Sequence, residues 1–397
     1  MSVTARIERL RQCYINSRPS ICCERARIYT ESHRRTEGQP LSLIHISIPV
    51  ATVGRVLTVA NGEEILRNGQ ADVIGYGRSL LCDPDIAVKT ERNESIRLCL
   101  NCNKGCVDAL QNRRYLSCVL NAENGDEETI FIRPGNGSKK VVIAGAGIAG
   151  LEAARVAARR GYSVTVYETA GELGGQINLA AVPPHKAEIM RAVDYYKKIL
   201  PALGVEIKLG TPCTVRDMNA ADAVIVAVGA HNAMPPIPGA NAANVVSAWD
   251  VLSGAVSVSG HCAVIGGGMV GTETAEYLLS RGCQVSIIEM LDKIAAGESG
   301  SILPTILADF KAGKVAQYVN TRVCSITAEG IAAVNTVTND DVIIPCDWVV
   351  MAVGSEKNEF CIDGITAPVY FVGDCSGEKT ADIASAVRTA YHTANSI

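Results

Sequence analysis

The stretch that decides the fold is KKVVIAGAGIAGLEAARVAARRGYSVTVYE, residues 139–168. Its first apolar run, Val141 to Ala144, predicts a buried parallel strand. Three glycines follow with G-x-G-x-x-G spacing, and an alanine-rich helical pattern begins at once; they are Gly145, Gly147 and Gly150. A strand, this glycine spacing and a helix in succession predict a fold that binds a dinucleotide.

Each of these residues has a physical role in such a fold. Gly145 allows the tight turn, Gly147 lets the backbone approach a pyrophosphate, and Gly150 lets helix and strand pack closely. The unpaired N–H groups and the positive dipole end of the helix then favour phosphates. Glu168 follows a second strand, Ser163 to Tyr167, and can accept hydrogen bonds from ribose hydroxyls. The alternative is a glycine-rich turn without a ligand, which this structural context disfavours.

The same unit occurs a second time, in CAVIGGGMVGTETAEYLLSRGCQVSIIE, residues 262–289. Its glycines are Gly266, Gly268 and Gly271, and its terminal acid is Glu289. In both units the acid lies 23 residues after the first glycine. The chain therefore predicts an α/β protein with two Rossmann-like folds. Two such folds suggest two dinucleotides held so that a hydride can pass between them.

Composition narrows the class of protein. The 397 residues are enough for two or three domains, and 48% hydrophobic with 20% charged residues fits a soluble globular chain. A net charge of −4 gives no broad basic surface for nucleic acid. No apolar run reaches the ~18 residues that a membrane helix needs, and the arginine-rich N-terminus does not resemble a signal peptide. Fifteen cysteines favour a reducing cytoplasm and a metal site over a disulfide framework.

Four of the cysteines form a motif of their own, CLNCNKGCVDALQNRRYLSC, with the spacing C-x2-C-x3-C-x11-C. They are Cys99, Cys102, Cys106 and Cys118. Thiolates are soft ligands that suit zinc or an iron–sulfur cluster. Zinc sites usually pair two C-x2-C knuckles, whereas three close cysteines and one distant cysteine favour a [4Fe–4S] cluster. We expect residues 96–134 to form this iron–sulfur segment, with zinc as the alternative.

The preceding stretch, Ile48 to Asp85, predicts strand, helix, strand. Both predicted strands end in a Gly-Arg pair, Gly54-Arg55 and Gly77-Arg78. Loops of this kind after consecutive parallel strands suit a phosphate, and the last two strands of a (β/α)8 barrel commonly provide such a site. Because a barrel needs ~250 residues, we expect residues 48–95 to be a remnant of strands 7 and 8. An ordinary βαβ piece is the alternative.

The order of these motifs resembles the C-terminal part of the iron–sulfur branch of the old yellow enzyme-like flavoproteins, which includes 2-enoate reductase, 2,4-dienoyl-CoA reductase and trimethylamine dehydrogenase. The resemblance covers residues 48–397 and extends through GELGGQI and YFVGDC. It implies a barrel that binds FMN and reduces an activated alkene or enoyl thioester. It also implies a cluster that carries electrons between FMN and FAD, and NAD(P)H that reduces FAD. The family's substrate pocket and proton donor belong to six earlier barrel strands, so no catalytic residue is assigned and FMN should bind weakly or not at all.

The resemblance assigns residues to each cofactor. FAD would bind residues 138–240 and 345–397, at Gly145, Gly147, Gly150, Glu168, Gly175, Gln176, Gly373 and Asp374. NAD(H) would bind residues 245–344, at Gly266, Gly268, Gly271 and Glu289. The FMN phosphate would meet Gly54, Arg55, Gly77 and Arg78. Since Glu289 would accept from a ribose 2′-OH and repel a 2′-phosphate, NADH is favoured, with NADPH as the alternative.

Two elements near the C-terminus would complete the flavin site. A strand, Val369 to Asp374, would deliver Asp374 to the ribityl chain, and a helix, Ala381 to Ala394, would direct its N-terminus at the flavin ring. The alternative for Asp374 is a helix cap. The isolated cysteines are expected to pack in the core; they are Cys213, Cys262, Cys283, Cys324, Cys346 and Cys361.

Residues 1–47 differ from the rest of the chain. RPSICCERARIYTES, residues 18–32, resembles the N-terminus of glycyl radical enzymes, whose radical chemistry lies in parts that this chain lacks. LSLIHIS, residues 41–47, resembles a translated sequencing adapter. We therefore expect a foreign, chimeric arm that contributes no activity.

Together these expectations describe an NADH-dependent flavin and iron–sulfur oxidoreductase with a small-molecule substrate. The candidate macromolecular partners are a second copy of the chain or an electron-acceptor protein, and neither nucleic acid nor a membrane is expected. Two alternatives remain. One is a reductase whose cluster feeds a separate protein, and the other is an inactive, misassembled fragment.

Overall fold

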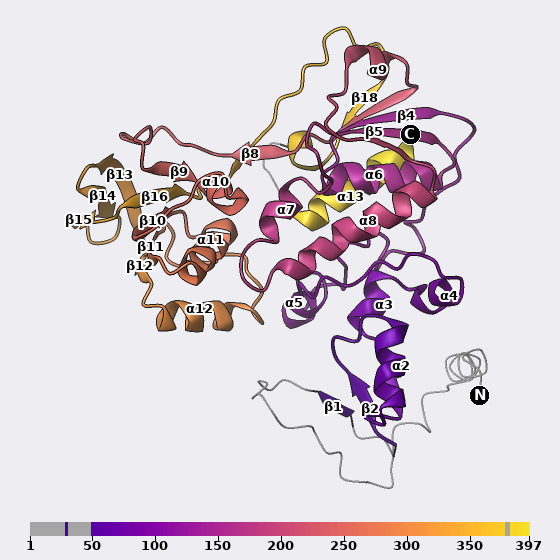
Figure 1. The fold of residues 1–397 in the computed structure, drawn as a ribbon, viewed down its shortest axis with the longest axis horizontal. Helices are drawn as coiled ribbons and strands as arrows, with labels where there is room; N and C mark the ends of the chain where they lie inside the picture. The colour runs from indigo at the N-terminus through magenta and orange to yellow at the C-terminus, as the bar shows by residue number, and fades with distance from the viewer. Residues whose placement is uncertain (1–27, 31–48, 378–381) are drawn as a thin grey trace. The chain divides into compact units, whose positions relative to one another are not determined.

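The computed structural model describes residues 28–30, 49–377 and 382–397 (Figure 1). The chain forms two compact units, Met1–Asn101 and Cys102–Ile397. The adapter-like segment lies outside the described residues, as does the glycyl radical-like segment apart from strand β1.

The first unit contains a small parallel sheet in the order β1-β2-β3. Its strands are β1 (Ile28–Thr30), β2 (Ala51–Val53) and β3 (Val73–Gly75), and its helices are α2 (Val59–Arg67), α3 (Arg78–Cys82) and α4 (Ile86–Glu91). Helix α2 begins after Thr58, whose hydroxyl accepts the Asn61 N–H at 3.1 Å. The predicted strand, helix and strand are therefore confirmed. Arg78, however, is the first residue of a helix rather than part of a loop, because the strand ends at Gly75.

The second unit contains two five-stranded sheets whose strands all run parallel. The first has the order β18-β7-β4-β5-β6. Its strands are β4 (Lys140–Ala144), β5 (Ser163–Tyr167), β6 (Glu206–Lys208), β7 (Ala223–Val226) and β18 (Val369–Phe371). The second has the order β12-β11-β10-β16-β9. Its strands are β9 (Val245–Ser247), β10 (His261–Ile265), β11 (Gln284–Ile288), β12 (Ala316–Tyr318) and β16 (Trp348–Met351).

Helices cover one face of the first sheet. They are α6 (Ile148–Arg159), α8 (Arg191–Ala202) and α13 (Ile383–Ser396), packed around α6 as Figure 1 shows. The alanines Ala153, Ala154 and Ala157 of α6 are fully buried, because small side chains let three helices approach one another. On the other face, Val224 and Val226 pack with Met218 of α9 (Val215–Asn219).

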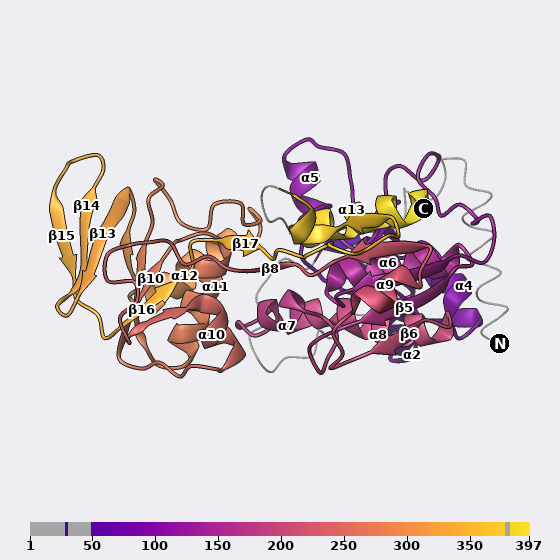
Figure 2. The ribbon, with the colours of Figure 1, turned by 90° about the horizontal axis from the view of Figure 1, so that it is seen from above.

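The second sheet is covered on both faces, and alternate residues of β10 serve the two layers. Cys262 and Val264 pack with the helical layer, which consists of α10 (Ala248–Ser253), α11 (Met269–Ser280) and α12 (Leu303–Ala312). Ala263 and Ile265 pack with an antiparallel sheet of β13 (Thr321–Thr327), β14 (Gly330–Asn335) and β15 (Asp341–Ile344). Figure 2 shows this antiparallel sheet as a separate layer.

The chain passes between the two sheets twice, and the two passages pair with each other. Strands β8 (Ala230–Asn232) and β17 (Ser355–Lys357) form a two-stranded antiparallel ribbon. The remaining short helices of this unit are α5 (Val107–Gln111), α7 (Gln176–Ala180), η1 (Ala187–Met190) and η2 (Gly373–Ser376).

Candidate functional site: the two glycine-rich turns

The first glycine of each turn has a backbone that only glycine adopts readily. Gly145 has φ +104° and Gly266 has φ +99°. A Cβ atom at either position would also press against a carbonyl oxygen of the neighbouring strand's end, that of Ala227 or Ala352. Gly150 and Gly271 similarly lie against the carbonyls of these first glycines. The predicted tight turn and close helix packing therefore have a visible steric cause in both folds.

The middle glycines face open space instead. Gly147 precedes α6 and Gly268 precedes α11, both in extended backbone. A Cβ atom at either position would meet no atom within 4 Å. The first amides of a helix have no intrahelical acceptor, so the space in front of each helix is a cradle that a diphosphate would fill.

The two glutamates occupy equivalent positions in the two folds. Glu168 accepts the N–H of Ala146 at 2.7 Å, and Glu289 accepts the N–H of Gly267 at 2.6 Å. Each carboxylate also accepts an amide two residues further along the chain, at 2.8 Å. Both acids are half-buried beside the turn. A carboxylate has about four lone-pair sites, so each retains capacity to accept ribose hydroxyls.

The remaining candidate flavin residues gather at the first turn. Gly147 and Gly174 form an isolated parallel bridge. Gly175 is therefore close to Gly147, and a Cβ atom added at Gly175 would lie 3.1 Å from the Gly147 Cα. Gln176 donates from Nε2 to Asp374 Oδ2 at 3.0 Å. Gly373 has φ +68° and lies against Ala149, near the start of α6. Sequence-distant residues thus converge on one end of the first sheet.

One expectation about this region needs correction. Strand β18 ends at Phe371, and Asp374 lies in the 3-10 helix η2 instead of at the end of a strand. The predicted C-terminal helix is confirmed as α13, which begins at Ile383 after the cap residue Asp382, whose side chain accepts the Ser385 N–H at 3.0 Å. The Gly-Asp sequence ends the extended backbone early because Gly373 turns into the left-handed region.

The two Gly-Arg pairs of the first unit follow neighbouring strands. Gly54 and Arg55 come directly after β2, and Gly77 and Arg78 open α3 after β3. Because β2 and β3 pair in parallel, their carboxyl ends lie at the same edge of the sheet. Arg55 is exposed and Arg78 is half-buried.

The four motif cysteines are divided between the units: Cys99 lies in the first, and Cys102, Cys106 and Cys118 lie in the second. Within the second unit, the Ser117 N–H donates to the Gly105 carbonyl at 2.7 Å. This bond places the residues before Cys106 and Cys118 side by side, although these two cysteines are the most widely separated neighbours in the motif. No group of three or more metal-ligating side chains gathers within the ranges that the structure describes. The isolated cysteines are core residues in part, but Cys324 and Cys361 are exposed, which corrects the expectation that all of them pack inside.

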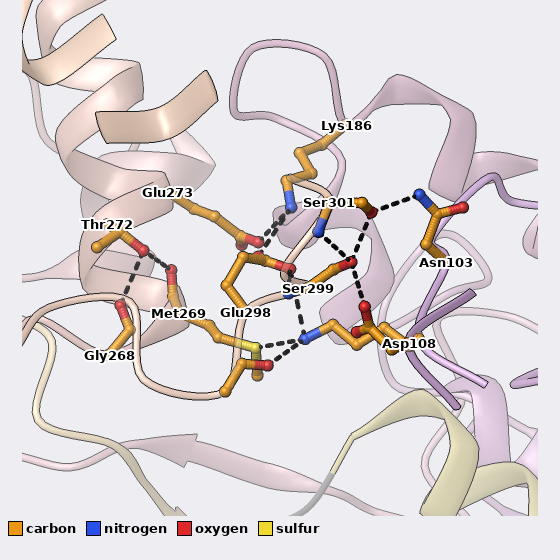
Figure 3. A network of polar contacts seen from close by, with 12 residues as sticks. Asn103, Asp108, Lys186, Gly268, Met269, Thr272, Glu273, Glu298, Ser299 and Ser301 are labelled. Atoms are coloured by element: carbon orange, nitrogen blue, oxygen red, sulfur yellow. Dashed lines mark hydrogen bonds and ion pairs between the residues drawn. The ribbon is translucent and has the colours of Figure 1, made fainter. Parts of the chain in front are cut away.

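A polar network that the sequence did not indicate lies beside the second turn (Figure 3). Lys186, from the loop after α7, pairs with Glu273 of α11 at 2.7 Å and with Glu298 at 3.7 Å. Asn103 donates to Ser301 at 2.9 Å, and Ser299 donates to Asp108 at 2.7 Å. These charged and polar side chains come from four separate stretches of the chain, and no local sequence pattern marks them.

The ionisation of this network is shifted by burial. Burial raises the pKa of Glu273 despite its lysine partner, and burial raises the pKa of Glu276 to about 7. Burial by itself would lower the pKa of Lys186, but the surrounding carboxylates, Glu273 first, raise it. The Lys186 ammonium group therefore stays charged, while the pKa values of Glu273 and Glu276 lie above that of an ordinary glutamate.

The fold and these turns define a class of oxidoreductase, and comparison with known proteins gives the family. Residues 139–369 match the model of the pyridine nucleotide-disulphide oxidoreductases. Because this match covers more than half of the chain, the chain belongs to that family of flavoprotein oxidoreductases.

Individual relatives agree with this class. The chain is 46% identical over 357 residues to a bilirubin reductase of Mediterraneibacter gnavus, covering 88% of this chain and 55% of that protein. It is 37% identical over 320 residues to an NADH oxidase of Thermoanaerobacter brockii, covering 78% and 49%. A 2-naphthoyl-CoA reductase structure superposes with a TM-score of 0.83 at 27% identity, covering 89% of this chain and 55% of that one. The chain thus spans about half the length of the relatives it matches, which are consistent with the 2-enoate reductase family. No described helix is long and apolar enough to cross a membrane.

Proposed function

We propose that the chain is the pyridine nucleotide-oxidising part of an NADH-dependent flavin and iron–sulfur reductase. The observation that carries the proposal is the duplicated site, in which each open cradle at Gly147 or Gly268 is paired with an acid at Glu168 or Glu289. One cradle suits the diphosphate of FAD and the other that of NADH. The NADH oxidase relative supports the choice of nucleotide.

The residues of the chain would bind and orient these groups. The amides at the starts of α6 and α11 would hold the two diphosphates, and Glu168 and Glu289 would hold the riboses. Gln176 and Asp374 would hold the polar middle of the flavin cofactor. When bound, NADH would supply a hydride, FAD would accept it, and a [4Fe–4S] cluster would carry single electrons onward.

We assign the cluster to Cys99, Cys102, Cys106 and Cys118, on the motif spacing and on the Gly105–Ser117 contact that closes it. FMN would use Gly54, Arg55, Gly77 and Arg78 at the shared edge of β2 and β3 in a complete barrel.

The relatives favour an activated alkene or enoyl thioester as the final small-molecule substrate, since 2-naphthoyl-CoA is a conjugated thioester. We also propose a cytoplasmic location, and a second copy or an electron-acceptor protein as a partner.

An anaerobic absorbance spectrum before and after NADH tests this proposal. We expect a flavin band near 450 nm over a broad brown shoulder, both of which bleach with NADH and bleach much less with NADPH. If the flavin band bleaches but the brown shoulder is missing from the spectrum, the cluster is absent and zinc is favoured at the four cysteines. A colourless or insoluble product would overturn the proposal in favour of an inactive fragment. Fast reduction of an added ferredoxin would favour the reductase that feeds a separate protein.

A further inference from the structure

The polar network beside the second turn contains a lysine from the cysteine segment, Lys104, which lies between Cys102 and Cys106 in the sequence. Its Nζ donates to the sulfur of Met269 at 2.8 Å and to the carbonyl of Gly297 at 2.9 Å. Met269 is the first residue of α11. The stretch around Gly297 also packs against the glycine-rich turn, because the Ala295 N–H donates to the Gly267 carbonyl at 2.6 Å. Lys104 therefore contacts the first residue of α11 and the loop that packs against the glycine-rich turn.

This position is electrostatically unusual for a lysine. The N-terminus of a helix carries a positive partial charge, which disfavours a cation. A thioether is a weak hydrogen-bond acceptor, and the ion pair of Lys104 with Glu298 is 3.6 Å long. The amine side chain is 28% exposed. An anion between the helix N-terminus and the ammonium group would satisfy both positive charges.

The negative charge of buried Glu298 has partners other than Lys104. The Glu298 side chain is 2% exposed, and its carboxylate also accepts the Ser299 N–H at 2.7 Å and lies 3.7 Å from the Lys186 ammonium group. Lys104 can therefore leave it without creating an uncompensated buried charge.

We propose that Lys104 is a diphosphate-binding residue of the nicotinamide site, whose ammonium group moves from Met269 and Gly297 onto a phosphate oxygen of the bound dinucleotide. This inference rests on the proposed function, in which the second glycine-rich turn binds NADH. Because Lys104 belongs to the cysteine segment, nucleotide binding would draw on that segment as well as on the second fold.

The test measures binding by titration calorimetry on the FAD-loaded chain. ADP-ribose serves as a probe that carries the diphosphate without nicotinamide, and adenosine as a probe without phosphate. We expect Lys104→Gln to raise the Kd for ADP-ribose by about tenfold or more, since a charge-assisted hydrogen bond is lost. Adenosine binding should be unchanged, and Lys104→Arg should restore most of the affinity for ADP-ribose. The matched control, Lys311→Gln, removes an exposed lysine of the same fold and should change nothing.

A second variant separates binding from a purely structural role. If Lys104 only neutralises Glu298, the double variant Lys104→Gln with Glu298→Gln should recover ADP-ribose binding, and that result would overturn the inference. So would equal ADP-ribose affinity in the wild type and Lys104→Gln. If the wild type binds ADP-ribose through Lys104 but NADH does not bleach the flavin, the inference holds and the proposed electron path fails. If the wild type is reduced by NADH but Lys104→Gln binds normally, only the inference fails.

Discussion

Gln176 and Asp374 lie 198 residues apart in the sequence, yet the amide of the first donates to the carboxylate of the second at 3.0 Å. Gln176 opens helix α7, and Asp374 lies in the 3-10 helix η2 after strand β18. The strand returns the chain to the edge of the first sheet beside β7, which is how the two residues meet. The pair is thus a product of the topology.

The pair gives a first prediction for flavin retention. Asp374→Ala removes an acceptor from the site that we assign to FAD, so the ratio of flavin absorbance to protein absorbance after gel filtration should fall at least severalfold. The matched control is Asp363→Ala, at an exposed loop position. Equal flavin content in both variants would show that Asp374 does not contribute to cofactor binding.

The glycines of the first turn should respond differently to the same substitution. Gly147→Ala places a methyl group in the open cradle without backbone strain, because φ is −70° there. We expect a folded protein whose FAD affinity falls by at least about tenfold, measured by flavin release on dilution. Gly145→Ala meets the Ala227 carbonyl at φ +104°, and we expect it to lower thermal stability sharply.

The equivalent change in the second turn provides the comparison. Gly268→Ala should keep its flavin but lose nucleotide binding, because its methyl group would enter the other cradle. If Gly147→Ala and Gly268→Ala affect the same cofactor, the assignment of one dinucleotide to each fold is wrong.

Glu289 should determine the choice of nucleotide. Glu289→Gln retains an acceptor for the Gly267 N–H but loses the negative charge that would repel a 2′-phosphate. We expect kcat/KM for NADH to fall about tenfold, measured by flavin reduction in stopped flow. The ratio of kcat/KM for NADH to that for NADPH should also decrease. Glu168→Gln is the internal control, since it should weaken flavin retention and leave the ratio of the two nucleotides unchanged.

The stability of the protein should depend on pH through Glu276. Burial raises the pKa of Glu276 to about 7 from 4.5, so the native chain binds more protons than the unfolded chain between these values. Stability therefore falls as the pH rises through this window. Glu276→Gln should be more stable than the wild type at pH 8, by on the order of 1 kcal/mol after solvent screening, and similar at pH 4.5.

Thermal unfolding monitored at several pH values measures this difference. Glu329→Gln, at an exposed position of the same fold, should follow the wild-type profile. A Glu276→Gln profile parallel to that of the wild type would show that Glu276 titrates outside the window.

The sequence by itself determined the local parts of this protein. Strands β4 and β10, the glycine-rich turns and the helices α6 and α11 follow from patterns within about thirty residues, because hydrophobic periodicity and glycine spacing act between near neighbours. The equivalent acids Glu168 and Glu289 were also predictable, since a fixed spacing places each at the end of the second strand.

Only the tertiary structure decided how these parts meet. The pairing of Gln176 with Asp374 and the meeting of Lys104 with Met269 join residues 198 and 165 positions apart. Charged and polar side chains carry no local signal for such contacts. The same cause explains the error at Asp374, where Gly373 packs against Ala149 and turns the chain before the predicted strand is complete.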